Sequence, residues 1–313
     1  MSIRSLDLLD LPFLSRYRQD VLVLDTGRML TRGNPIGTRA MLSYLNPSRQ
    51  IYTAVASGEG DTLMGQVILK AEERSARLTF LAPAGKINGL TLPLLEDLTR
   101  QAGEWGALYL LAEVDEESPA FKILRQAGFA MYGWQRAWKL PQLKGTAAES
   151  GWREVDELEW HAVQSLHGQI VPALLQTIET LPKEASGLVC RPEENLQAYT
   201  SVDSGTHGIW LQPLMPPDST CAAQQLLELL SIIPGAGRLP VYMCVRSYQA
   251  WLEASLEELG AEAGERQAIL YKRLAVNVKE AQSIPVLEKG LAKVKPTASV
   301  THIVETSNPK QDG

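Results

Sequence analysis

Two short stretches of the sequence carry groups that could do chemistry. Glu113 lies near the end of the apolar run 107–114 (ALYLLAEV), where a carboxylate could take up a proton. The loop 83–90 contains two glycines, Gly85 and Gly89, and precedes an expected helix whose first backbone N–H groups could bind an anion. Each stretch also has a simpler interpretation. Glu113 could pair with a neighbouring basic residue, and the loop could be an ordinary connection between a strand and a helix.

Other kinds of site are not indicated. Cys190, Cys221 and Cys244 are isolated, and neither they nor the four histidines show metal-ligand spacing, so we expect no metal site. Buried, reduced thiols are typical of a cytoplasmic protein. No stretch approaches the roughly 20 apolar residues of a membrane span. Asp7 and Asp10 interrupt the N-terminal apolar residues, which argues against a secretory signal.

Charge is unevenly distributed along the chain. Residues 1–146 carry 17 Lys and Arg against 15 Asp and Glu, whereas residues 147–276 carry 8 against 17, so the net charges are +2 and −9. This charge disfavours nucleic acid and anionic membranes as partners and mildly favours cationic ligands. An acidic surface that only maintains solubility is the alternative interpretation.

An internal repeat predicts two domains. At an offset of 149 residues, Arg4 corresponds to Arg153 and Asp7 to Asp156. Further along, the apolar runs 107–114 and 238–245 are each followed by an amphipathic stretch, a glycine and a basic-aromatic strand. We therefore expect a duplication with four parts: a first domain at 1–142, a linker at 143–149, a second domain at 150–278 and a flexible tail at 279–313.

Apolar periodicity and turn residues predict an α/β pattern in the first domain. Ser118 and Pro119 are suited to begin a helix, and Gly58–Asp61 is suited to a hairpin turn. Helices are expected near 7–17, 37–46, 91–103 and 119–127, and strands near 51–56, 63–70, 76–82, 107–114 and 131–140.

This order of elements, together with two motifs, resembles the GCN5-related N-acetyltransferase (GNAT) superfamily. The segment Pro83-Ala-Gly-Lys-Ile-Asn-Gly-Leu-Thr-Leu-Pro-Leu-Leu95 resembles the family's phosphate loop, with Lys86, Ile87 and Thr91 as departures from it. The segment Glu113-Val-Asp-Glu-Glu-Ser-Pro-Ala-Phe-Lys-Ile-Leu-Arg-Gln-Ala-Gly-Phe129 resembles the family's later motif. The resemblance implies two GNAT-like domains in tandem, each a mixed, mostly antiparallel sheet flanked by helices, with strands 76–82 and 107–114 splayed around a cofactor slot.

The resemblance also implies a cofactor, acetyl-CoA or another acyl-CoA, on the first domain. Glu113 stands where some members place a catalytic base. Leu124 stands where the family has a Tyr that acts as the general acid, so Tyr132 or water would have to supply the proton to the leaving thiolate instead. The residues expected to bind the cofactor are Phe80, Leu81, Ala82, Lys86, Ile87, Asn88, Gly89, Leu90 and Thr91.

The second domain departs further from the family. Its corresponding loop has Asp218 and no glycine, Cys244 replaces Glu113, and Leu256 fills the Tyr position.

The resemblance as a whole predicts an N-acetyltransferase that acts on a small-molecule or peptide amine, with cationic amines favoured. The alternative is a catalytically degenerate GNAT that serves as a CoA-binding or scaffold module. The sequence indicates neither the acceptor nor the acyl chain length, and it does not indicate the oligomeric state.

Overall fold

The structure is a computed structural model, and it describes residues 1–7, 10, 16–36, 49–58, 60–71, 73–86, 89–142, 150–191, 196–217 and 222–274. Four expected features lie largely or wholly outside these residues: the helices near 7–17 and 37–46, the linker 143–149 and the tail 279–313. The described chain is a mixed α/β structure with a largely antiparallel sheet. Within the described residues, no helix combines the length and apolarity that crossing a membrane requires.

The first half follows the expected order closely. Its elements are β1 (Ser2–Ser5), β2 (Leu22–Val23), α2 (Thr26–Arg32), β3 (Arg49–Gly58), β4 (Asp61–Lys70), β5 (Ser75–Ala82), α4 (Thr91–Glu104), β6 (Tyr109–Val114), α5 (Pro119–Gln126) and β7 (Ala130–Lys139). Gly58 pairs with Asp61 across the predicted hairpin turn, and Gly60 there has a φ of 84°, which favours glycine. Ser118 caps α5, and Pro119 is its first residue.

The second half repeats this order with a shorter, less regular middle. Its elements are β8 (Trp152–Glu154), α6 (Glu157–Ile170), β9 (Leu188–Cys190), β10 (Ala198–Ser204), β11 (Ile209–Leu214), α7 (Ala222–Ile232), β12 (Val241–Arg246), α8 (Leu252–Glu258) and β13 (Glu262–Arg273). Gly128 and Gly260, which end α5 and α8, both have positive φ, at 87° and 72°.

The same ion pair occurs at the start of both halves and supports the duplication. Arg4 pairs with Asp10 at 2.6 Å, and Arg153 pairs with Glu159 at 2.5 Å. The two pairs are related by the offset of 149 residues that the sequence suggests. The conserved spacing within one chain indicates that both halves begin with the same local structure.

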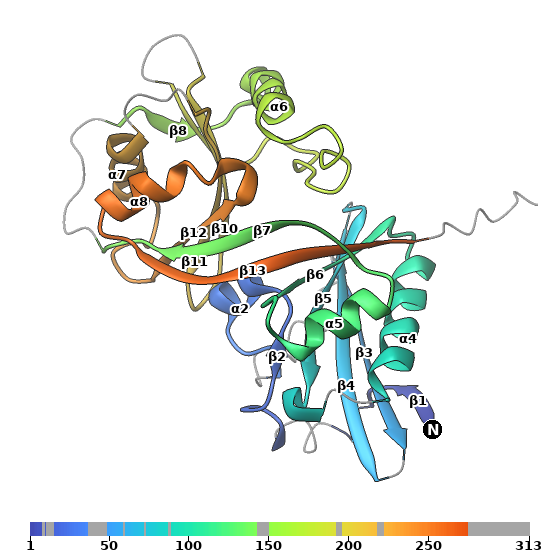
Figure 1. Cartoon of the computed structure of the whole chain (residues 1–313). Helices are drawn as coiled ribbons and strands as arrows, with labels where there is room; N and C mark the ends of the chain where they lie inside the picture. The colour runs from blue at the N-terminus through green and yellow to red at the C-terminus, as the bar shows by residue number, and fades with distance from the viewer. Residues whose placement is uncertain are drawn as a thin grey trace, which may run out of the picture. The chain divides into compact units, whose positions relative to one another are not determined.

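The two halves exchange their last strands (Figure 1). β13 belongs to the second half by sequence, but it lies between β6 and β7 of the first half and is antiparallel to both. β7 in turn pairs with β12 of the second half. The result is one 13-stranded sheet with the order β1-β3-β4-β5-β6-β13-β7-β12-β11-β10-β9-β8, while β2 pairs with β5 off this path. The expected boundaries at 142 and 150 therefore divide the sequence but cut across the hydrogen bonding.

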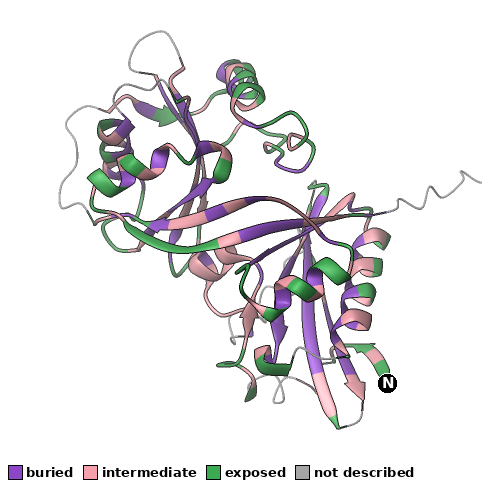
Figure 2. Ribbon diagram, viewed as in Figure 1, coloured by how far each residue is buried: buried purple, intermediate pink, exposed green. Residues whose placement is uncertain are grey.

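Separate apolar cores lie in the two halves (Figure 2). Leu94, Leu95 and Leu98 of α4 are fully buried in the first core. Leu270 of β13 belongs to this same core, although it comes from the second half of the sequence. The exchanged strand thus contributes packing as well as hydrogen bonds to the first half.

Helix α2 is held by the second half. Arg32 near its end pairs with Asp203 of β10 at 2.8 Å, and the carbonyl of Thr31 accepts a 2.9 Å hydrogen bond from the backbone of His207. Gly27 lies against the ring of Trp210 on β11, where a Cβ would be only 3.1 Å from the ring. Helix α2 of the first half is therefore anchored to the second half.

Candidate functional site

Strands β5 and β6 begin as neighbours and then separate. They pair in parallel only from Ser75 to Arg77 on β5 and from Tyr109 to Leu111 on β6. Beyond these residues the two strands are not paired with each other, as the sequence analysis expected. Their separation opens a gap between their carboxyl ends, bordered by Phe80, Leu81 and Ala82, which are all buried.

The chain itself fills this gap with residues 22–24. Leu22 pairs with Leu81 and Val23 with Phe80, both antiparallel. Leu24 connects the two separated strands, because its N–H donates to the Thr79 carbonyl and its carbonyl accepts from the Glu113 N–H, each at 2.9 Å. The slot expected between the strands is therefore present, but in this conformation β2 occupies it.

Glu113 lies at the inner end of this gap, and its carboxylate is almost fully buried, with 3% of the residue exposed. One carboxylate oxygen accepts a 2.8 Å hydrogen bond from the backbone N–H of Thr26, and the other is 3.5 Å from Arg77. Burial, and then the nearby Asp25 carboxylate, raises the pKa of Glu113, against the opposing effect of Arg77 and Arg246. A raised pKa suits a carboxylate that has to accept a proton near neutral pH.

The expected phosphate loop follows β5 and leads into α4. Lys86 pairs with Asp61 at 2.7 Å on the surface, so its charge is partly neutralised in this conformation. Gly89 is exposed, and a Cβ at this position would meet no atom within 4 Å. Leu90 and Thr91 lie at the start of α4, where Thr91 is fully buried. Ile87 and Asn88 lie outside the described residues, and the assignment of all these residues to a cofactor stays a prediction.

A buried polar network lies at the junction of the two halves, where β7 pairs with β12, and no pattern in the sequence indicated it. Arg246 at the end of β12 pairs with Glu179 at 3.2 Å and donates to the side chain of Gln135 on β7. Tyr132, also on β7, donates its hydroxyl to Glu179 at 2.7 Å. Strand exchange brings these groups together, because β7 lies next to β12 only in the exchanged sheet.

A cavity of about 680 Å³ adjoins this network. Arg77, Tyr132, Glu179 and Arg246 line it, and so does Ser75, whose buried hydroxyl has no hydrogen-bond partner within the described part of the chain. A smaller neighbouring cavity shares Arg77 and Arg246 with the first and is also lined by Glu113. The junction thus places the candidate base beside a polar space large enough for a small molecule.

Several solved structures resemble this chain over most of its length. A GCN5-related N-acetyltransferase from Sphaerobacter thermophilus aligns with a TM-score of 0.55 and 12% identity, over 87% of this chain and 95% of that protein. A tandem GNAT protein from the clavulanic acid biosynthesis pathway aligns with a TM-score of 0.50 and 14% identity, over 87% of this chain and 98% of that protein. The chain has the tandem GNAT fold. The sequence matches no protein-family model and no curated protein sequence.

Within this GNAT fold, β5 and β6 are the splayed strands of the first half. Leu124, which the resemblance places at the position of the family's proton-donating Tyr, lies on α5. Leu124 and its counterpart Leu256 are both fully buried in apolar cores and have no proton to give. Tyr132 lines the junction cavity, but burial and the adjacent Glu179 carboxylate raise its pKa well above the ordinary value. A raised pKa makes Tyr132 a weaker acid, and its role as proton donor stays a prediction.

In the second half of the GNAT fold, a side chain forms hydrogen bonds with the backbone where β11 separates from β12. β11 and β12 pair in parallel only from Ile209 to Leu211 on β11. The buried side chain of Gln249 then donates to the Pro213 carbonyl at 2.9 Å and accepts from the Met215 N–H at 3.1 Å. In this half, a side-chain amide therefore satisfies the backbone groups at the end of β11.

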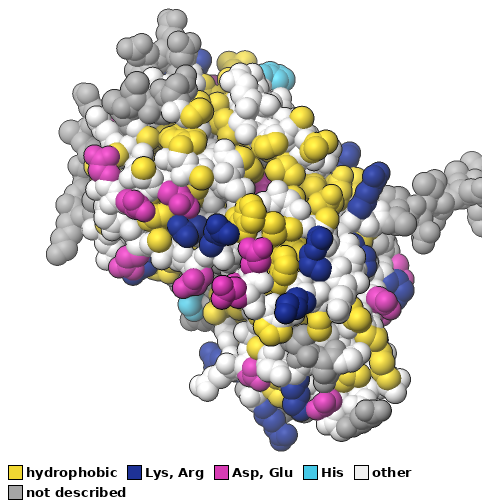
Figure 3. Space-filling model, viewed as in Figure 1, with side chains coloured by type: hydrophobic (Ala, Val, Ile, Leu, Met, Phe, Trp, Pro, Cys, Tyr) yellow, Lys and Arg dark blue, Asp and Glu magenta, His cyan; other side chains and the backbone are white. Residues whose placement is uncertain are grey.

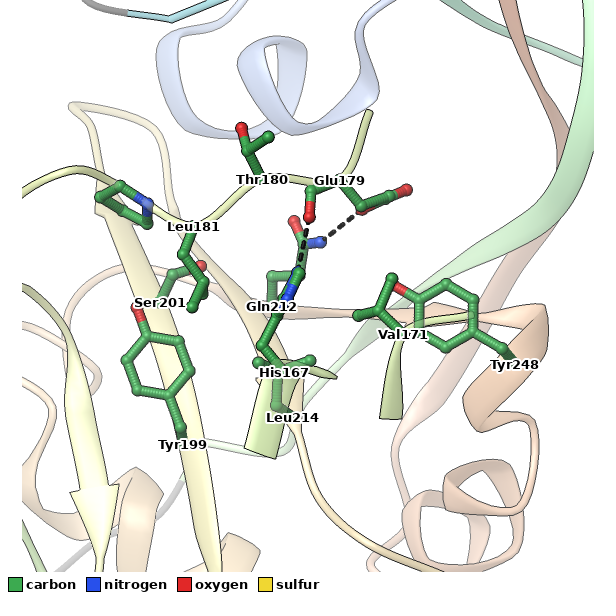
Figure 4. Close-up of a pocket in the computed structure, with 11 residues that line it drawn as sticks. His167, Val171, Glu179, Thr180, Leu181, Tyr199, Ser201, Gln212, Leu214 and Tyr248 are labelled. Carbon is green, nitrogen blue, oxygen red and sulfur yellow. Dashed lines mark hydrogen bonds between the residues drawn. The ribbon is translucent and has the colours of Figure 1, made fainter. Parts of the chain in front are cut away.

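A third, smaller cavity lies beside these strands (Figure 4). His167 approaches the Glu179 carbonyl at 2.6 Å, and Gln212 donates to the Glu179 carboxylate at 3.1 Å. Tyr199 and Tyr248 border the same space. Glu179 thus bonds to both halves through Gln212 on one side and Tyr132 on the other, which makes it a central residue of the junction.

Proposed function

We propose that the protein is an acyl-CoA-dependent N-acyltransferase whose first half binds the cofactor, acetyl-CoA or another acyl-CoA. The observation that carries the proposal is the position of Glu113. This buried carboxylate is the next-to-last residue of a strand that splays from its neighbour, and it lines a polar cavity at the junction. The GNAT fold supports the same class of reaction, but one fold hosts many functions, so the site carries the argument.

The groups bordering the gap suit the cofactor, although the gap itself is filled in this conformation. The edge of β5 offers backbone groups at Thr79 and Leu81 to an extended ligand, as it does to β2. The loop from Lys86 to Thr91 offers a basic side chain and the start of a 14-residue helix to phosphates. Binding therefore requires residues 22–24 to move out of the gap.

Each residue has a defined task in the proposed reaction. Acyl-CoA, when bound, supplies the acyl group as a thioester. Glu113 accepts a proton from the acceptor ammonium, which frees the nitrogen lone pair for attack on the acyl carbon. Arg77 stabilises the Glu113 carboxylate before this transfer. As the C–S bond breaks, the nitrogen loses its second surplus proton, and water is the proposed carrier of this proton to the departing thiolate. Tyr132 is disfavoured as the donor because its pKa is raised and its hydroxyl is bonded to Glu179.

The junction cavities are the proposed acceptor site. Their lining mixes acidic and basic side chains. The surface is similarly mixed, because Lys, Arg, Asp and Glu are interspersed on the face that Figure 3 shows. Glu73, Glu179 and Asp203 would attract the cationic amine that the net charge favours. Arg77 and Arg246 would in turn bind an anionic group on the same acceptor.

The proposal is tested by transfer of label from radioactive acetyl-CoA to a panel of amines. The panel contains polyamines, aminoglycosides, amino acids and peptide N-termini. We expect Glu113→Gln to reduce transfer by about 10²- to 10⁴-fold, the usual contribution of a general base. Glu116→Gln is the matched control, because Glu116 is an exposed carboxylate just beyond the same strand. Transfer unaffected by Glu113→Gln would show that Glu113 is not the base.

A non-catalytic role is the second candidate, and one observation favours it. The protein's own groups form hydrogen bonds with the ends of the splayed strands β5 and β11. The backbone of Leu24 does so in the first half, and the side chain of Gln249 does so in the second. A GNAT closed in this way permanently would act as a scaffold. Titration with CoA separates the two candidates, because a bound ligand at 100 times its Kd stabilises a fold by about 2.7 kcal/mol and a scaffold shows no such shift.

A further inference from the structure

The segment Asp20–Thr26 imitates an extended ligand inside the first half. We propose that this segment is an internal latch that closes the cofactor slot, occupies the candidate base, and has to be displaced before acyl-CoA binds. The inference rests on the proposed function, since it concerns the same slot. Its support comes from the hydrogen bonds at both ends and in the middle of the segment.

The middle of the latch uses the backbone groups that an extended ligand would need. Leu22 and Val23 extend the sheet along the edge of β5, and Leu24 connects this edge to β6. A pantetheine chain lying between the same strands would need the same donors and acceptors, including the Thr79 carbonyl. The latch and the cofactor therefore cannot occupy the gap together.

One end of the latch places a carboxylate at the start of the phosphate loop. The Asp20 carbonyl accepts from the N–H of Ala84 at 3.0 Å, and the Asp20 carboxylate accepts from the N–H of Gly85 at 3.2 Å. Both donors are backbone amides that immediately precede Lys86. An internal anion thus lies beside the loop to which the sequence analysis assigned the cofactor phosphates.

The other end of the latch binds the candidate base. The backbone N–H of Thr26 donates to the Glu113 carboxylate at 2.8 Å, and the Thr26 hydroxyl donates to Gln267 on the exchanged strand β13 at 2.7 Å. A base engaged in this way has one carboxylate oxygen fewer with which to take a proton from an amine. Closure therefore acts on the slot and on the base at the same time.

The latch is held weakly enough to leave. β2 is only two residues long, and Leu24 is the one residue of the segment 20–26 that is buried, whereas the others are half-buried or exposed. The end of helix α2 stays fastened to the second half through the pair between Arg32 and Asp203. Thr26 is the last residue of the latch and the first residue of α2, so the chain would turn within this helix, after Thr26 and before the fastened Arg32.

Hydrogen exchange in the native chain tests the displacement directly. Saturating CoA should increase exchange of the amide hydrogens of Leu24, Thr26 and Glu113, because their bonds to Thr79, Glu113 and Leu24 break. Ligands ordinarily slow exchange at their sites, so an increase confined to these amides is a distinctive signature. Amides in the middle of β4, such as that of Val67, are the internal control. Bound CoA with unchanged exchange at Leu24 overturns the latch.

A reversible cross-link provides the second test. Val23 and Phe80 are opposite each other in a non-hydrogen-bonded pair, where Cβ atoms are closest, so Val23→Cys with Phe80→Cys can form a disulfide. In its oxidised form, this double variant should bind CoA roughly 100-fold or more weakly than the same protein after reduction, because the disulfide prevents the latch from leaving the slot. The reduced form is the matched control for the substitutions, and the native chain under the same oxidant controls for its own cysteines.

The outcomes separate the two proposals. Equal CoA affinity of the oxidised and reduced double variant overturns the latch and leaves the proposed function standing. Absence of CoA binding in the native chain and in the reduced variant overturns the cofactor assignment itself, and the latch with it. CoA binding that the disulfide prevents and reduction restores supports both.

Discussion

Replacing Gly205 by alanine should destabilise the protein through one well-defined collision. Gly205 lies in the turn between β10 and β11, against the end of α2. A Cβ at this position would lie 2.1 Å from the Thr31 carbonyl oxygen and 2.7 Å from its carbon. Both are backbone atoms that no side-chain rotation can move away. The same carbonyl accepts the hydrogen bond from His207, so α2 cannot shift without losing that bond.

Overpacking in a dense interior costs about 1–3 kcal/mol, and contact with fixed backbone atoms places Gly205→Ala at the upper end of that range. A loss of about 3 kcal/mol corresponds to a decrease in Tm of about 5 °C for a chain of 313 residues, because the entropy of unfolding is roughly 2.1 cal/mol/K per residue. Gly168→Ala is the matched control. Gly168 is exposed on α6 with no atom within 4 Å of a new Cβ, so this substitution should raise stability by about 0.5–1 kcal/mol.

Urea denaturation and thermal unfolding of the native protein and both variants measure these differences. A Gly205→Ala variant as stable as the native protein would show that the contact between α2 and the turn is not present in solution. A Gly168→Ala variant destabilised to the same extent as Gly205→Ala would show that the effect is not specific to the junction.

Three further predictions follow from the site and the sheet. As the proposed base, Glu113 would act only when deprotonated, and its pKa is raised by burial. The kcat/KM for acyl transfer should therefore fall as pH drops through a value above the ordinary 4.5 of Glu, and Glu113→Gln should abolish this acidic limb. Gly89→Glu should weaken CoA binding in calorimetric titration by adding bulk and negative charge at the phosphate loop, whereas Gln224→Glu, in the first turn of α7, should not; equal losses would place the cofactor elsewhere. Leu270→Ala in β13 should cost about 2–5 kcal/mol and increase hydrogen exchange in β6 of the first half, and unchanged exchange there would contradict the strand exchange.

Local patterns predicted most of the described elements of the first half. The apolar run 107–114 and the alternation at 76–82 matched β6 and β5 to within two residues, and Ser118 with Pro119 located the start of α5. These features depend on neighbours within a few residues, which sequence periodicity records. β2 and α2 were missed, because a two-residue strand has no periodicity of its own and forms only where a gap receives it.

Strand exchange could not be predicted from the same patterns. β7 and β13 are both basic-aromatic strands that end their halves of the sequence. Either strand could therefore complete either sheet, and the sequence does not indicate which partner each strand takes. The junction network was missed for this reason. Arg246 and Glu179 are distant in sequence from Tyr132 and Gln135, and the exchanged sheet brings these four residues together. Glu113, by contrast, lies one residue before the end of its own strand, so motif and position could point to it.

The exchanged strands also impose an order on synthesis. β6 is complete once residue 114 has been made, but its neighbour β13 begins only at residue 262, so 147 residues, 115 to 261, intervene. At usual translation rates this delay is roughly 7–30 s. During that time β6 lacks its neighbour on one edge, and exposed strand edges favour aggregation. The first half is therefore the earlier to be translated but cannot complete its fold until the last strand of the second half has emerged.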